Sequence, residues 1–123
     1  MGENKEYISL PDEKGSINIS EEVIAVIAAN AALETECISG LAATLGKDFA
    51  ERLGKKSAQK GIKLQFSDDN NLAVDVYVLT KLGCSISKVG TDVQNNVVSA
   101  IEAATGITVT EVNVHVCGIS LDK

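Results

Sequence analysis

Two short stretches of the chain share one pattern, in which valine alternates with a polar or aromatic residue. They read VDVYV at 74–78 and VNVHV at 112–116. Such alternation predicts β-strands with one buried face and one open face. A long helical pattern joins the two strands, and a strand–helix–strand connection within one sheet is right-handed and makes its strands parallel. No other feature of the sequence constrains the fold as strongly.

The connecting helix is predicted over residues 85–106. Its apolar residues recur at the three- and four-residue spacing of one helix face: Val89, Val93, Val97, Ala100, Ile101 and Ala104. Gly106 follows as a left-handed C-cap, and Ile107 supplies the hydrophobic contact that accompanies such caps. The pattern predicts an amphipathic helix that packs one face on the sheet.

An earlier helix is predicted to follow Ser20, a favourable N-cap residue. Glu21 and Glu22 lie in its first turn, where they suit the positive end of the helix dipole. Valine, isoleucine and alanine fill most of the sequence EEVIAVIAANAALE, so the apolar surface is wider than one stripe. We therefore expect this helix to be buried on more than one side.

A third strand is predicted at 62–66, where IKLQF alternates. SDDNN at 67–71 predicts a turn, because Asp and Asn tolerate left-handed backbone and hydrogen-bond to their own main chain. Between residues 37 and 61 the pattern loosens, and we expect a short helix and a loop. The predicted fold is α+β, a two-layer sandwich with a mixed sheet of three main strands, covered on one face by two long helices. GSINIS at 15–20 predicts an additional short edge strand.

Length and composition indicate one domain. The chain has 123 residues, 45% of them hydrophobic, and we expect a flexible tail at 1–14, the domain at 15–120 and a C-terminal tail at 121–123.

The net charge of −6 argues against nucleic acid as a partner. No apolar run approaches the roughly 20 residues of a membrane helix and no signal peptide is recognisable, so we expect a cytoplasmic protein without direct membrane insertion.

The three cysteines are Cys37, Cys84 and Cys117. They are odd in number and widely spaced, and no C-x-x-C pair occurs. This usage favours reduced thiols over a disulfide framework or a zinc site.

The candidate site residues lie on the predicted sheet face opposite the valines. They are polar or aromatic and come from three strands: Lys63, Gln65, Asp75, Tyr77, Asn113, His115 and Cys117. His115 and Cys117 are two positions apart, which alternation alone produces, whereas metal sites need three or four converging ligands. We expect no catalytic, cofactor or metal site. We predict self-association or docking of a protein partner through this face; a weak metal or ligand site using Asp75 or another chain is the alternative.

A basic segment provides a second candidate contact. It contains Lys47, Arg52, Lys55, Lys56 and Lys60. One interpretation is a solvated connection between two ordered parts of the domain. The other is an electrostatic contact with an anionic surface.

Five longer stretches carry a family resemblance. In chain order they are GSINISEEVIAVIAANAALE, KGIKLQF, VDVYVLTKLG, VQNNVVSAIEAATG and VNVHVCGI. With these motifs at these intervals, the chain from Gly15 to about Ile119 resembles the alkaline shock protein family of Gram-positive bacteria, also described as envelope stress response proteins. It departs from the family at Cys37 and Ile38, where Gly-Val is usual, and at Ser87, where proline is usual.

The resemblance implies a non-enzymatic cytosolic protein linked to cell-envelope homeostasis, which reaches the membrane through an integral membrane partner. It transfers no catalytic residue and no cofactor. The predicted order of helices and strands also resembles nucleic-acid-binding KH domains, but the chain lacks their G-x-x-G loop and is acidic. An interaction or scaffold module is therefore the favoured function. A KH-like nucleic-acid-binding module and a weak metal- or ligand-binding protein are the alternatives.

Overall fold

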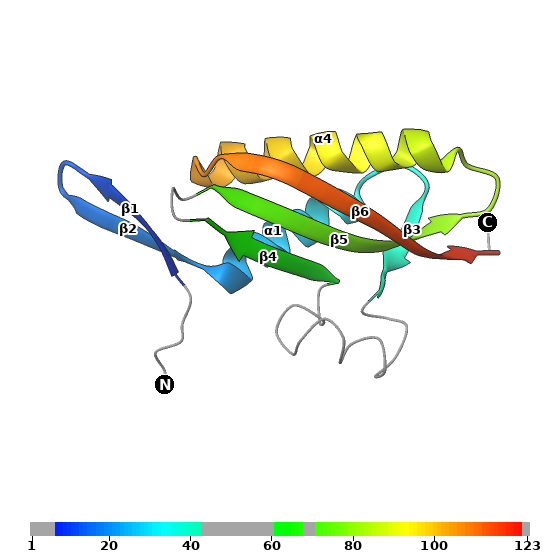
Figure 1. Cartoon of the computed structure of the whole chain (residues 1–123), viewed down its shortest axis with the longest axis horizontal. Helices are drawn as coiled ribbons and strands as arrows, with labels where there is room; N and C mark the ends of the chain where they lie inside the picture. Colours follow the sequence, from blue (N-terminus) through cyan, green and yellow to red (C-terminus); the bar gives the residue numbers. More distant parts are fainter. Residues whose placement is uncertain (1–6, 43–60, 68–70, 122–123) are drawn as a thin grey trace.

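The computed structural model describes residues 7–42, 61–67 and 71–121. In chain order its elements are β1 (Tyr7–Asp12), β2 (Gly15–Ser20), α1 (Glu21–Leu33), β3 (Ile38–Leu41), β4 (Ile62–Phe66), β5 (Leu72–Lys81), α4 (Ile86–Thr105) and β6 (Val109–Ser120). They form an α+β fold with two helices and a mixed sheet, as the sequence predicts (Figure 1).

Strand β5 is the centre of the main sheet. Along one edge it pairs with β6 in parallel, with Val76 beside Val114. Along its other edge it pairs antiparallel with β4 and then with the short strand β3, which follow one another along β5. The parallel pair, the crossover helix and the antiparallel hairpin partner are all confirmed.

The core lies between the main sheet and the two helices. Fully buried side chains come from α1, β4, β5 and α4: Ile24, Ile62, Leu72, Val74, Val76, Val78, Val93, Val97 and Ile101. The valine faces predicted from alternation are therefore the inner faces. Val114 and Val116 of β6 are only partly buried, since β5 is the only neighbour of β6 among the described strands.

The helix ends follow the predicted capping rules. The Ser20 hydroxyl accepts a hydrogen bond from the Val23 N–H at 3.2 Å, which is the N-cap geometry. Gly106 has φ 77° and its N–H bonds to the Glu102 carbonyl at 2.9 Å, while Ile107 is buried. Helix α1 thus begins, and α4 ends, at the cap residue that the sequence predicts.

The N-terminal region differs from the prediction. Residues 7–12, expected within a flexible tail, form β1, which pairs antiparallel with β2 in a separate two-stranded sheet. Ile8 and Leu10 alternate with Ser9 and Pro11, so a period-two signal was present but short. Figure 1 shows this hairpin projecting from one end of the molecule, so β2 is not an edge strand of the main sheet.

The region after α1 also differs from the prediction. Residues 38–41, expected within a short helix and loop, form β3, whose register against β5 shifts between Ile38 and Gly40. A four-residue strand with an irregular register carries too little alternation to be recognised from sequence. The rest of the expected helix and loop, residues 43–60, lies outside the described residues.

A disulfide joins Cys37 to Cys84, with a Cα–Cα distance of 6.3 Å. The prediction of three reduced thiols is therefore wrong for this pair, and Cys117 alone is a free thiol among the described residues. Sequence spacing could not reveal the pair, because the fold brings together residues 47 positions apart. Cys37 has φ 76°, a left-handed conformation that favours glycine.

The inner face of β5 should not tolerate a charge. Val76 is fully buried, so Val76→Asp should reduce the free energy of unfolding by about 3 kcal/mol or more, since it buries an unpaired carboxylate. His115→Ala, on the open face, should change it by less than about 1 kcal/mol. Chemical denaturation of both variants measures the difference, and similar losses would contradict the assignment of the two faces.

The disulfide should contribute to stability. Closing a loop of 47 residues stabilises a fold by about 4 kcal/mol in the chain-entropy account. Dithiothreitol and the double substitution Cys37→Ser, Cys84→Ser should therefore lower the melting temperature to the same extent. Cys117→Ser is the matched control and should melt like the unchanged protein; an unchanged melting temperature on reduction would show that the pair does not stabilise the fold.

Candidate functional site

The register of the main sheet brings the predicted site residues together. Lys63 of β4, Asp75 of β5 and Asn113 of β6 lie side by side in one row across the sheet. Tyr77 and His115 are neighbours in the next row. Gln65 and Cys117 lie further along β4 and β6, so all seven residues fall on one face. We call this set the open sheet face.

The centre of the open sheet face is a ring pair. The rings of Tyr77 and His115 are stacked, with centroids 4.4 Å apart and an angle of 13° between their planes. His115 Nε2 lies 3.1 Å from the Asp75 carboxylate. Two neighbours therefore hold the imidazole, one through its ring face and one through its ring nitrogen, so its orientation is fixed before any partner arrives.

The backbone of Gly61 supports this arrangement. The Tyr77 N–H donates to the Gly61 carbonyl at 2.9 Å, which holds the start of β4 against β5. Gly61 has φ 67°, and a Cβ there would lie 3.0 Å from Leu41 Cβ and 3.1 Å from the Tyr77 carbonyl oxygen. A side chain at this position would force the strands apart, so glycine is required beneath the ring pair.

Glycines also make room for an apolar side chain at the edge of the open sheet face. Leu79 is half-buried and is paired with Gly118 of β6 and Gly40 of β3. A Cβ at Gly118 would lie 3.2 Å from Leu79 Cδ2, and one at Gly40 would lie 3.8 Å from Leu79 Cδ1. Leu79 has the same strand parity as Asp75 and Tyr77, which puts it on this face, but the sequence alone does not show that two glycines flank it.

Two titratable groups of the open sheet face, Tyr77 and Cys117, have raised pKa values. The Cys117 thiol donates to the His115 carbonyl at 3.6 Å, and burial raises its pKa. Burial, followed by the Asp75 and Cys117 charges, raises the pKa of Tyr77. Both groups are therefore protonated at neutral pH, so Cys117 is not an activated thiolate nucleophile. In the described part of the chain, no three His, Cys, Asp or Glu side chains converge to hold a metal ion.

Exposure differs among the seven residues. Lys63, Gln65, Asn113 and His115 are exposed, whereas the others are half-buried. Asn113 also donates to the Glu111 carboxylate at 3.2 Å, an acidic neighbour that was not among the predicted residues. The five basic candidates, Lys47, Arg52, Lys55, Lys56 and Lys60, lie outside the described residues.

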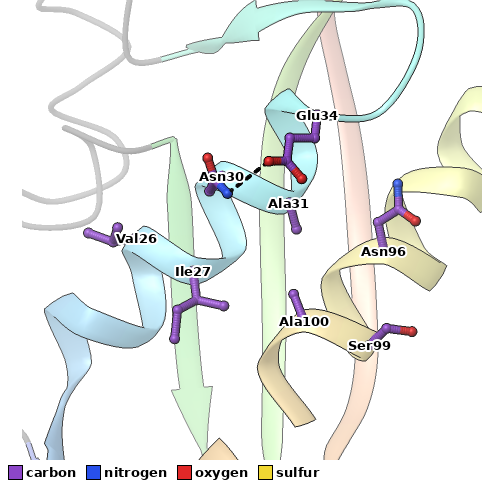
Figure 2. A pocket seen from close by; sticks show the side chains of 8 residues that line it. All are labelled: Val26, Ile27, Asn30, Ala31, Glu34, Asn96, Ser99 and Ala100. Atoms are coloured by element: carbon purple, nitrogen blue, oxygen red, sulfur yellow. Dashed lines mark hydrogen bonds between the residues drawn. The ribbon is translucent and has the colours of Figure 1, made fainter. Parts of the chain in front are cut away.

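A groove lies on the helix layer, between α1 and α4. Its volume is about 620 Å³, and it is lined by Val26, Ile27, Asn30, Ala31, Glu34, Asn96, Ser99 and Ala100. Figure 2 shows Ala31 and Ala100 facing each other between the two helices, and small side chains at such positions leave the space open. Helix α1 is buried against both the sheet and α4, as the sequence predicts, but Val23, Val26 and Leu33 leave one side of it exposed.

Two hydrogen bonds connect the end of α1 to α4, and these two helices form the walls of the groove. Asn96 of α4 donates to the Thr35 hydroxyl at 2.8 Å, and that hydroxyl donates to the Ala31 carbonyl at 3.0 Å. Thr35 is buried, so these bonds are shielded from water. Together with the nearby Cys37–Cys84 disulfide, they tie the end of α1 to α4.

None of the described helices is both long enough and apolar enough to cross a membrane.

Comparisons with known proteins agree with the sequence resemblance. Over 108 residues the chain is 35% identical to the uncharacterized protein YqhY of Bacillus subtilis, covering 88% of this chain and 79% of the relative. Over 114 residues it is 31% identical to YloU of the same organism, covering 91% and 94%. Over 109 residues it is 32% identical to Spy1535 of Streptococcus pyogenes, covering 89% and 82%. No solved structure matches.

The model of one protein family spans residues 9–121, which is nearly the whole chain. It therefore includes the open sheet face, both helices of the groove and most of the β1–β2 hairpin. The chain belongs to the alkaline shock protein 23 family, which is described as having a cell envelope-related function.

Proposed function

We propose that this protein is a non-enzymatic interaction module of the cell envelope, which acts on the cytoplasmic side and self-associates through the open sheet face. The observation that carries the proposal is the Tyr77–His115 stack held by Asp75. Rigid rings provide contact area at a low cost in conformational entropy, because their orientation is set before binding. The half-buried Leu79 and Ala73 add apolar area around them.

A second copy of the chain is the occupant that suits this face. Lys63 and Asp75 lie side by side in the register and carry opposite charges. In a two-fold symmetric dimer each surface meets its own copy, so the lysine of one copy can approach the carboxylate of the other. A face with charges of one sign would repel its copy, whereas this face is complementary to itself.

An envelope role requires a route to the membrane. The described helices provide no membrane span, and the family is described as cell envelope-related. We infer that an integral membrane protein recruits the chain. Self-association then gives the assembly several contacts with the membrane protein instead of one. Linked weak contacts raise the overall affinity of such an assembly by several orders of magnitude.

Removing the ring pair should weaken self-association. The double substitution Tyr77→Ala, His115→Ala should raise the dimer dissociation constant about tenfold or more, because paired rings contribute apolar area and stacking. Sedimentation equilibrium measures this constant, and circular dichroism checks that the variant is folded. The matched control is Ile17→Ala, Ile86→Ala, which removes two exposed apolar side chains away from this face. A folded ring-pair variant with unchanged association would refute the proposed interface.

The non-enzymatic part of the proposal has its own test. Zinc and nucleotides at millimolar concentration should leave the melting temperature unchanged, since a ligand that binds only the folded state raises it by mass action. Differential scanning fluorimetry with and without each ligand measures the shift. A concentration-dependent rise with zinc that disappears in His115→Ala would instead assign a metal site to the open sheet face.

A further inference from the structure

Helix α1 is apolar around most of its circumference, and one apolar side of it is exposed. Ile24 and Ala28 face the core and are fully buried. On the other side Val23, Val26 and Leu33 remain 49%, 45% and 48% exposed. Single exposed apolar residues are common on protein surfaces, but these recur at intervals of three and seven along one helix face. A helix that is apolar all round is normally buried all round, and no described element of the chain covers this side of α1.

Two hollows lie along α1, and their linings include Val23 and Val26 but not Leu33. The groove against α4 is about 620 Å³, and an adjoining hollow of about 300 Å³ is lined by Ser20, Glu22, Val23, Val26 and Ile27. Val26 and Ile27 line both, so the hollows continue one into the other. They extend from Ser20 to Glu34, which is about 20 Å along the helix axis. A partner helix of about four turns matches this length.

The charged residues among the described lining of these hollows are both acidic. Glu22 lies at one end of α1 and Glu34 at the other, and none of the described lining residues is Lys, Arg or His. Asn30 donates to the Glu34 carboxylate at 3.2 Å, which holds it at the rim (Figure 2). The nearest described cation on α4, Lys88, is paired with Asp92 at 3.0 Å. The rim therefore attracts cations.

The charge pattern selects among occupants. In a symmetric dimer through α1, the two acidic ends of one helix would meet the acidic ends of its copy, and like charges oppose such a contact. An anionic lipid surface is repelled for the same reason. A helix with an apolar stripe flanked by Lys or Arg complements both the apolar floor and the acidic ends.

We propose that the α1–α4 groove binds a basic amphipathic helix of a partner protein. Its apolar side chains occupy the hollows beside Val26, Ile27 and Ala100, and its Lys or Arg residues pair with Glu22 and Glu34. The proposed envelope role requires a partner protein, and the groove indicates that this partner presents a basic amphipathic helix. The groove lies on the helix layer and the open sheet face lies on the other side of the sheet, so each surface can fail without the other.

The test uses a fluorescently labelled 18-residue peptide of leucine, alanine and lysine, with leucines on one helical face and lysines beside them. Fluorescence anisotropy should show saturable binding to the full chain. Val26→Gln should weaken binding about tenfold, because it removes one buried aliphatic contact. Ile86→Gln is the matched control, since Ile86 is also 45% exposed on a helix but lies outside the groove; its affinity should equal that of the unchanged protein.

The electrostatic part is tested separately. Glu34→Gln should weaken binding about threefold, and added salt should reduce the difference, as for an exposed ion pair. Glu36→Gln removes an equal charge outside the groove lining and should have no effect. The variant Tyr77→Ala, His115→Ala should bind the peptide normally even if it no longer self-associates, which separates this inference from the proposed function.

Five outcomes would overturn the inference. A peptide with scrambled sequence that binds equally well would show that binding is not specific to an amphipathic helix, and unchanged affinity in Val26→Gln would place the contact elsewhere. Loss of self-association in Val26→Gln would assign the groove to a second copy. Binding to phosphatidylglycerol vesicles that Val26→Gln abolishes would assign it to a membrane surface. Stronger binding of a synthetic peptide of residues 43–60 than of the designed helix would assign it to the chain's own basic segment.

Discussion

Burial of one face of β5 is the constraint on which the rest of the structure depends. Val74, Val76 and Val78 are fully buried, and β5 is paired along both of its edges. A central strand with such an inner face needs apolar cover, which α1 and α4 supply. Because both helices lie on this side, no described helix covers the other side of the sheet. The two candidate surfaces of the molecule, the open sheet face and the α1–α4 groove, follow from this division.

The strand register determines which side chains of the alternating pattern become neighbours on the open sheet face. Parallel pairing of β5 with β6 sets Tyr77 beside His115, and the pleat turns both rings outward. A shift by one residue would bury the rings and expose the valines, at the cost of the whole core. The stacking distance of 4.4 Å and the contact with Asp75 therefore depend on the same packing that fixes the valines inside. A small change of register would therefore alter both the stability of the fold and the geometry of this face.

Sequence reasoning predicted the elements whose periodicity is long and regular. Strands β4, β5 and β6 and helix α4 carry clear alternation or a single apolar stripe, and Gly106 and Ser20 mark helix ends. Strand β2 was predicted, but β3, β1 with its pairing to β2, and the Cys37–Cys84 disulfide were missed, because short strands give weak patterns and distant cysteines meet only in three dimensions. All seven open-face residues were predictable from parity. The Asp75–His115 contact and the glycines beside Leu79 were not, because they depend on cross-strand register.

The same physical argument separates the two surfaces by the occupant each fits. The open sheet face holds Lys63 beside Asp75, so it is complementary to a copy of itself, whereas the groove carries Glu22 and Glu34 and fits a cation-bearing partner. The walls of the groove are also fixed to each other, since the Asn96–Thr35 hydrogen bond joins the end of α1 to α4. The disulfide adds a second tie between the segments that follow α1 and precede α4. A groove of fixed width loses little conformational entropy when a helix enters, and this favours a rigid helical ligand over a flexible one.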